Sequence, residues 1–148
     1  MSRRTPPLAL GAVLASALAA CGADPRGGEP LPDGGGVPGT FSSIAENVLV
    51  PRCATTACHS GNPPPTAPTS LDRELAYGQL VDVPSIQAPA LMLVEPGAPE
   101  RSYLVLKLRG TAGDAGGVPT PMPTGDTLLD EAEIQAIEAW IAVGAPND

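Results

Sequence analysis

The stretch RCATTACHSG, from Arg52 to Gly61, holds two of the three cysteines and the only histidine of this 148-residue chain. Cys58 is followed directly by His59, and Cys53 stands five positions before Cys58. Three interpretations are open: a haem attachment site with two additional residues, a small disulfide, or a chance cluster. The fold depends on the choice, because a cofactor or a cross-link would complete a core that the sequence fills poorly.

Covalent haem attachment normally uses the spacing C-x-x-C-H, in which both cysteines bond to the haem and the histidine ligates iron. Here the spacing is C-x4-C-H, so the adjacent pair Cys58 and His59 is kept and Cys53 is displaced. At about 100° per residue, cysteines five positions apart do not share a helix face. We therefore expect the residues between them to bulge out as a loop.

Residues 1–20 have the features of a cleaved export signal. Arg3 and Arg4 precede the apolar run Leu8–Ala20, which is short for a membrane span and ends in small residues. The string LAAC that ends at Cys21 resembles the lipobox of bacterial lipoproteins. That resemblance implies that Cys21 is lipidated and becomes the first residue of the mature protein; the alternative is an ordinary signal peptide followed by a free cysteine.

A tether and one domain follow the signal. Residues 21–39 are rich in Gly, Pro and Asp and lack apolar periodicity, so they predict a flexible tether, and the domain is expected at 40–148. By resemblance to lipoproteins, Gly22 after the cysteine favours sorting to the outer membrane, where there is one. The protein would then be anchored to the cell envelope by lipid, facing the periplasm or the outside.

The charge balance bears on possible partners. The chain has 8 basic and 16 acidic residues, and cleavage before Cys21 would remove Arg3 and Arg4. The mature chain would then carry about ten net negative charges, which argues against nucleic acid or anionic lipid as a partner and permits a basic protein.

Four segments have helical patterns. Phe41–Val50 has Ser42 or Ser43 as a cap and places Ile44 and Val48 inward; Pro51 is expected to end or kink it. Leu71–Val81 places Leu71, Leu75 and Tyr77 inward. Ser102–Leu108 could be strand or helix, and Ser102 as a cap with Leu104 and Leu108 four apart favours a helix, which Gly110 stops. The last segment is Asp130–Val143.

Asp130–Val143 has the strongest helical pattern. Asp130 and Glu133 form a capping box, and Gly144 is placed as a left-handed stop. The apolar face comprises Ile134, Ile137, Trp140 and Ile141. With 17 Gly and 19 Pro in long loops and no strand-rich pattern, the sequence predicts a mostly α fold: a few short helices joined by Pro/Gly-rich loops.

From Phe41 to its end, the chain resembles the small cytochrome-c-like domains of exported bacterial proteins, including the planctomycete-type cytochrome c group. The matching pieces are FSSIAENVLVPRCATTACHS (41–60), VEPGAPERSYLVLKL (94–108), PMP (121–123) and LLDEAEIQAIEAWIAVGAP (128–146). The resemblance implies a small helical cytochrome-c-like domain with an N-terminal helix, a haem-binding segment, a long loop with a Met-Pro, and a C-terminal helix.

The same resemblance implies the ligands of a covalently attached haem c. Cys53 and Cys58 would form the thioether bonds, His59 would be the proximal iron ligand, and Met122 the distal one. Met92 is the rival distal ligand, but its apolar neighbours favour a place in the core. The implied function is a lipid-anchored electron carrier with a redox protein partner, not an enzyme.

Other functions remain open. Cys53 and Cys58 could form a disulfide in a structural or interaction lipoprotein, because an even cysteine pair in an exported domain is typical of one. A haem sensor whose distal position is open to small gases is a third possibility. Hydrolase chemistry is disfavoured by the single histidine and by the lack of a nucleophile elbow or a Gly-rich phosphate loop.

Overall fold

The structure is a computed structural model of the whole chain, and it describes residues 37, 39–66, 68–125 and 128–148. The predicted export signal (1–20), the lipidation site Cys21 and nearly all of the predicted tether (21–39) lie outside these residues. The predicted domain (40–148) is described apart from residues 67, 126 and 127.

The described residues are mostly helical and hold no strand, which confirms the coarse fold class predicted from the sequence. The α-helices are α1 (Phe41–Ile44), α2 (Val50–Arg52), α3 (Ala76–Leu80), α4 (Tyr103–Leu108) and α5 (Glu131–Ala142). A π-helical turn (Ala45–Leu49) joins α1 to α2, and 3-10 turns lie at Pro99–Arg101 and Ala112–Ala115. Isolated β-bridges pair Val81 with Val94 and Pro84 with Met92.

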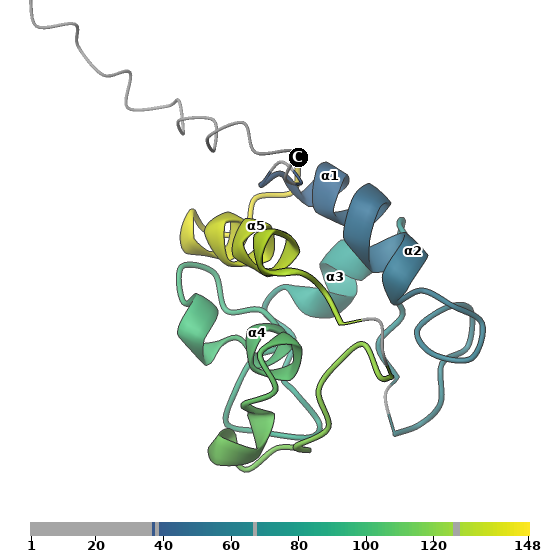
Figure 1. Cartoon of the computed structure of the whole chain (residues 1–148), viewed down its shortest axis with the longest axis vertical. Coiled ribbons are helices and arrows are strands. Elements are labelled where there is room, and N and C mark those ends of the chain that lie inside the picture. The colour runs from purple at the N-terminus through teal and green to yellow at the C-terminus, as the bar shows by residue number, and fades with distance from the viewer. Residues whose placement is uncertain (1–36, 38, 67, 126–127) are drawn as a thin grey trace, which may run out of the picture.

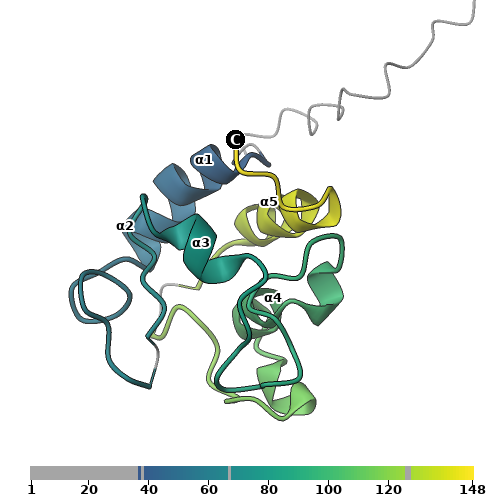
Figure 2. The same cartoon turned by 180° about the vertical axis from the view of Figure 1, so that it is seen from behind.

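The two end helices form the upper layer of the molecule in Figure 1. Helix α5 packs against α1 and α4, while α3 lies behind and α4 below (Figures 1 and 2). The C-terminus returns to the start of α1, where the backbone N–H of Phe41 donates to Asp148 Oδ1 at 2.7 Å. Long loops leave the helical layer on the opposite side.

The first helix is longer than its pattern predicts and begins with a different cap. The side chain that accepts from the first turn belongs to Thr40, which receives the N–H of Ser43, so the predicted caps Ser42 and Ser43 are wrong. The helical chain continues to Arg52, past Pro51. A proline lacks the N–H of a regular turn and crowds the carbonyl four residues earlier, and the wider π turn before it relieves that crowding.

The second predicted helix is shorter than expected. Leu71–Val81 was predicted as helix, but α3 begins only at Ala76, and Leu75 is 47% exposed instead of facing inward. Leu71 is buried, and its N–H donates to the carbonyl of His59 at 2.7 Å. A turn at 73–75 precedes the helix, and Ala76 and Leu80 supply its buried face.

The third and fourth helices are close to the predicted ranges. Ser102 precedes α4, but its hydroxyl donates to Ala98 O at 2.9 Å and does not cap the helix, so that part of the prediction is wrong. Helix α5 has the predicted capping box between Asp130 and Glu133, and Gly144 has the positive φ of a left-handed stop.

The described residues form an apolar core of their own. Trp140 is 1% exposed, its ring centroid lies 5.4 Å from that of Phe41, and Tyr77 packs edge-on against Phe41 at 5.1 Å. Ile44 and Val48 are buried as predicted. Three of the four aromatic side chains thus join α1, α3 and α5, and Trp140 belongs to this core.

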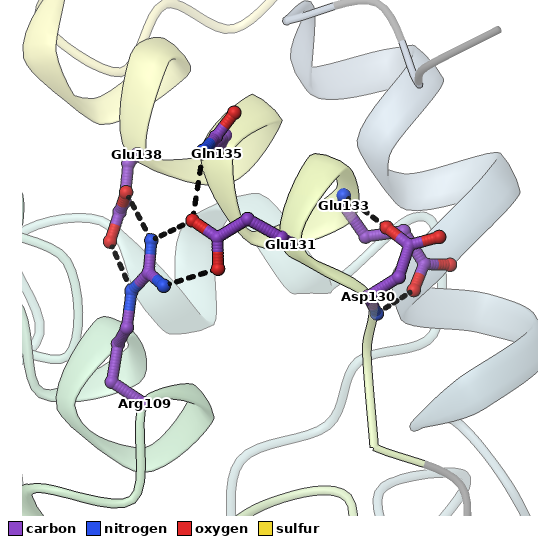
Figure 3. Close-up of polar contacts among 6 residues, drawn as sticks. All are labelled: Arg109, Asp130, Glu131, Glu133, Gln135 and Glu138. Atoms are coloured by element: carbon purple, nitrogen blue, oxygen red, sulfur yellow. Dashed lines mark hydrogen bonds and ion pairs between the residues drawn. The ribbon is translucent and has the colours of Figure 1, made fainter.

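Helix α5 is also tied to α4 by an arginine. The Arg109 guanidinium donates to both carboxylate oxygens of Glu131 (2.7 and 3.0 Å) and of Glu138 (both 2.8 Å), as Figure 3 shows. Gln135 donates to Glu131 as well, and these hydrogen bonds raise the pKa of Arg109 and lower the pKa of Glu131. The end of α4 is therefore fixed along one side of α5.

Candidate functional site

A cavity of about 680 Å³ is the candidate site. Its walls come from the cysteine segment, the loop before α3, α3 itself, the following loop, α4 and the Met122 segment. The volume is in the range of sites that enclose cofactors and drug-sized ligands, roughly 300–1,000 Å³. All four residues that the resemblance assigns to haem binding line this one cavity: Cys53, Cys58, His59 and Met122.

The cysteine segment leaves α2 as a tight turn. The carbonyl of Cys53 accepts the N–H of Thr55 at 2.8 Å and that of His59 at 3.2 Å. Thr55, Thr56 and Ala57 are exposed and outside any helix, so the residues between the cysteines bulge outward as the spacing predicts. The turn closes on Cys53 and brings His59 back to the wall on which Cys53 lies.

The ring of His59 is held by a backbone carbonyl. Its Nδ1 lies 2.8 Å from the carbonyl oxygen of Thr69. A carbonyl oxygen only accepts, so Nδ1 carries the proton of this bond, and in the neutral ring Nε2 keeps its lone pair. Histidines that ligate metals are commonly oriented by such a bond from the other ring nitrogen.

A second set of bonds closes the loop from residue 60 to residue 71. The carboxylate of Asp72 accepts from Ser60 Oγ at 2.7 Å, from the Gly61 N–H at 2.8 Å and from Ser70 Oγ at 3.0 Å. These hydrogen bonds, led by that of Gly61, lower the pKa of Asp72. Together with the backbone bond from Leu71 to His59, they form a neck that we call the Asp72 clamp. Thr69, the acceptor of the His59 ring, stands just inside it.

The two thiols differ in their surroundings. Cys53 is partly buried and Cys58 is exposed, and both are free cysteines. Burial raises the pKa of the Cys53 thiol to about 11, although the neighbouring Arg52 guanidinium opposes the shift. Arg52 donates to Glu133 Oε1 and to the carbonyl of Leu128, so the end of α2 is bound to the start of α5.

The two candidate distal ligands are clearly separated. Met122 is partly buried and lines the cavity, and its N–H donates to the carbonyl of Lys107 at 3.0 Å. Met92 is 36% exposed, does not line the cavity, and is not the core residue that its apolar neighbours predict. Its segment pairs with Pro84 in an isolated bridge, which leaves the side chain at the surface.

Lys107 is a cavity residue that the sequence patterns did not single out. It is 6% exposed, and its Nζ donates to the carbonyl of Val118 at 3.0 Å and to that of Thr120. Burial lowers the pKa of its ammonium group. The signal that could have found it is its isolation, because it is the only lysine of the chain and stands in the apolar run YLVLKL.

The donor set fits a haem better than a bare metal ion. Among the residues that the structure describes, no three histidine, cysteine, aspartate or glutamate side chains are placed to hold a metal. An apolar cavity with one free imidazole nitrogen, two thiols and a thioether on its walls matches the groups that hold a c-type haem. Within the described part of the chain, no helix reaches the length and apolar character that a membrane span requires.

No family model, curated protein or solved structure matches the chain.

Proposed function

We propose that this chain is a c-type cytochrome that carries electrons on a covalently attached haem, with a small cytochrome-c-like domain. Cys53 and Cys58 would hold the haem by thioether bonds, His59 would be its proximal iron ligand and Met122 its distal ligand. The observation that carries the proposal is convergence: residues about sixty positions apart in the sequence line one cavity.

The oriented histidine is the second support. Because Nδ1 of His59 is engaged by Thr69, the nitrogen left to bind iron is Nε2. The ring is placed before any cofactor arrives, which reduces the ordering that binding requires. A disulfide between the two cysteines gives no reason for this orientation.

The remaining wall residues would exclude water and stabilise the apolar faces of the ring. Leu71, Leu80, Leu104 and Leu108 line the cavity, and three of them belong to α3 and α4. A haem between histidine and methionine ligands supplies one-electron chemistry at a raised reduction potential. His59 and Met122 would both serve as iron ligands and would leave the iron no position for a substrate, so the proposed role is electron transfer and not catalysis.

The setting of the protein is part of the proposal. Lipidation at Cys21 would tether the domain to the cell envelope, in keeping with the export-type sequence before it. The excess of acidic residues suits a basic redox partner, because opposite charges speed encounter at low salt.

The deciding experiment is a haem stain after denaturing electrophoresis. The full chain is exported in a host with c-type maturation, next to Cys58→Ala and Cys53→Ala variants. We expect a stained band that is lost in Cys58→Ala, since only covalently bound haem survives denaturation. A weaker stain in Cys53→Ala than in the wild type would show that Cys53 also bonds to the haem.

A thiol assay gives the opposite outcome a clear form. A well-expressed but unstained chain, in which Cys53 and Cys58 have no free thiol, would mean a disulfide. The protein would then be a stapled lipoprotein, and the cytochrome proposal would be wrong.

A further inference from the structure

The Met122 segment approaches α4 along a single helix face. The Val118 N–H donates to the hydroxyl of Tyr103 at 3.1 Å, and the Met122 N–H donates to the carbonyl of Lys107. Tyr103 and Lys107 are four residues apart, so their side chains lie one turn apart on the same face. The segment contains two prolines and no helix or strand, so these contacts largely determine where it runs.

Lys107 makes most of these contacts. Its backbone carbonyl receives Met122, and its ammonium group donates to the carbonyls of Val118 and Thr120. One residue of α4 thus binds the segment at three positions out of five. The ammonium contacts precede Met122 by two and four residues, so they fix the approach to the proposed ligand.

The chemistry of the side chain exceeds what packing requires. Burying an ammonium group is costly unless hydrogen bonds replace its water, and both acceptors here are uncharged carbonyls. A leucine or methionine would fill the same space without that cost. Arginine would not serve in its place, because the planar guanidinium does not fit where a compact ammonium group donates to two carbonyls. The lysine is therefore explained by the two carbonyls that it holds.

We propose that Lys107 is a positioning residue, which fixes the Val118–Met122 segment against α4 and so sets Met122 on the cavity wall. The inference rests on the proposed function, in which Met122 ligates iron. Lys107 itself is not a ligand in this role, since it acts through the loop.

The first test uses the full chain without haem. Full chains carrying Lys107→Met are compared with the wild type by amide hydrogen exchange at Val118 and Met122 and by peroxide oxidation of methionine. Met92, at 36% exposure, is the internal reference for oxidation. We expect the ratio of Met122 to Met92 oxidation, and exchange at both amides, to rise about tenfold, because hydrogen bonds from charged donors are among the stronger ones.

The matched control is Arg101→Met. Arg101 is also basic and lies near the other end of α4, but its guanidinium is exposed and pairs with Glu95 at the surface. This variant should leave the ratio unchanged, and Lys107→Arg should restore it only in part. The positioning role would be overturned if Lys107→Met left the ratio of Met122 to Met92 oxidation unchanged. It would also be overturned if amide exchange in α5 rose as much as exchange at Val118 and Met122. Should Lys107→Met not fold, Lys107→Gln is measured by the same criterion.

The haem-loaded protein gives the second readout. Lys107→Met should weaken the sulfur-to-iron charge-transfer band of the ferric form and lower the reduction potential in the direction of Met122→Ala. A band and potential equal to those of the wild type would contradict the proposal. If the wild type takes up no haem, the proposed function fails, while the oxidation ratio still decides the role of Lys107.

Discussion

Asp72 shows how one carboxylate fixes a site that it does not line. Its oxygens hold Ser60, Gly61 and Ser70, which flank the loop between His59 and Leu71. His59 and Thr69 lie directly beside these three residues, so the bond between ring and carbonyl depends on the loop being closed at this point. A small displacement of Thr69 would therefore change the orientation of the His59 ring.

The Asp72 clamp is expected to depend on pH. The folded-state pKa of Asp72 is lowered, so the carboxylate stabilises the closed loop above its ordinary pKa of about 4 and loses that effect as the pH falls through the lower folded value. The Gly61 amide resonance should therefore titrate below pH 4 in an NMR pH series.

The comparison for this titration is Asp72→Asn, with Glu74→Gln as the matched control on an exposed neighbour. The Gly61 shift should be flat in the first variant and unchanged in the second. A wild-type midpoint at or above the ordinary aspartate value would show that the clamp does not form in solution.

At the scale of elements, α5 is fixed by two arginines between its first turn and its middle. Arg52 reaches its first turn from α2, and Arg109 holds its exposed side from α4. Helix α2, which precedes the cysteine segment, and helix α4, to which the Met122 segment is hydrogen-bonded, are thus connected to the same third helix. Their separation, and with it the width of the cavity, depends on these ties.

Replacing Arg109 by methionine should loosen this arrangement. Glu131 and Glu138 would lose their shared partner and face each other with like charge, so we expect a loss of about 1 kcal/mol in the free energy of unfolding, larger at low salt than at high salt. Urea unfolding at two salt concentrations measures it.

Arg101→Met is again the control, because Arg101 pairs with a single carboxylate, Glu95. Its loss should be smaller and should depend less on salt. Equal effects for the two variants would mean that the Arg109 network adds nothing beyond one surface pair.

The elements that could be predicted from the sequence are those whose signals are local. Helix α5 has its cap, its apolar face and its glycine stop within fifteen consecutive residues, and its predicted bounds agree with the structure to within one residue at each end. The helix after residue 71 is shorter than its pattern predicts: Leu71 and Asp72 are bonded to His59, Ser60 and Gly61, and a turn at 73–75 precedes α3. A helical pattern does not contain such distant partners.

The candidate site divides in the same way. Cys53, Cys58, His59 and Met122 were named from motifs, and the structure places all four on one cavity. The residues that orient them were not found, because Asp72, Thr69 and Lys107 act through contacts that join distant segments. Their types are ordinary for loops and helices, so only their partners reveal their role.

At the scale of the whole molecule, the core and the cavity share a wall, because Leu71, Leu80 and Leu108 belong to the buried core and also line the cavity. The aromatic cluster of Phe41, Tyr77 and Trp140 joins α1, α3 and α5 and does not line the cavity. The aromatic part of the core therefore packs within the chain itself, and the residues around the cavity are the ones that a haem would contact.

Because Trp140 lies in the core and not on the cavity wall, it can serve as an intrinsic optical reporter. It is the only tryptophan, it is buried, and its indole N–H donates to the carbonyl of Pro146 at 2.9 Å. The haem-free chain should therefore fluoresce at the short wavelengths of a buried indole, and unfolding should shift that emission to longer wavelengths. A haem in the cavity would drain the excited state by energy transfer, so the loaded protein should be nearly dark. Equal tryptophan fluorescence in the haem-free and the haem-loaded protein would contradict a haem in this cavity.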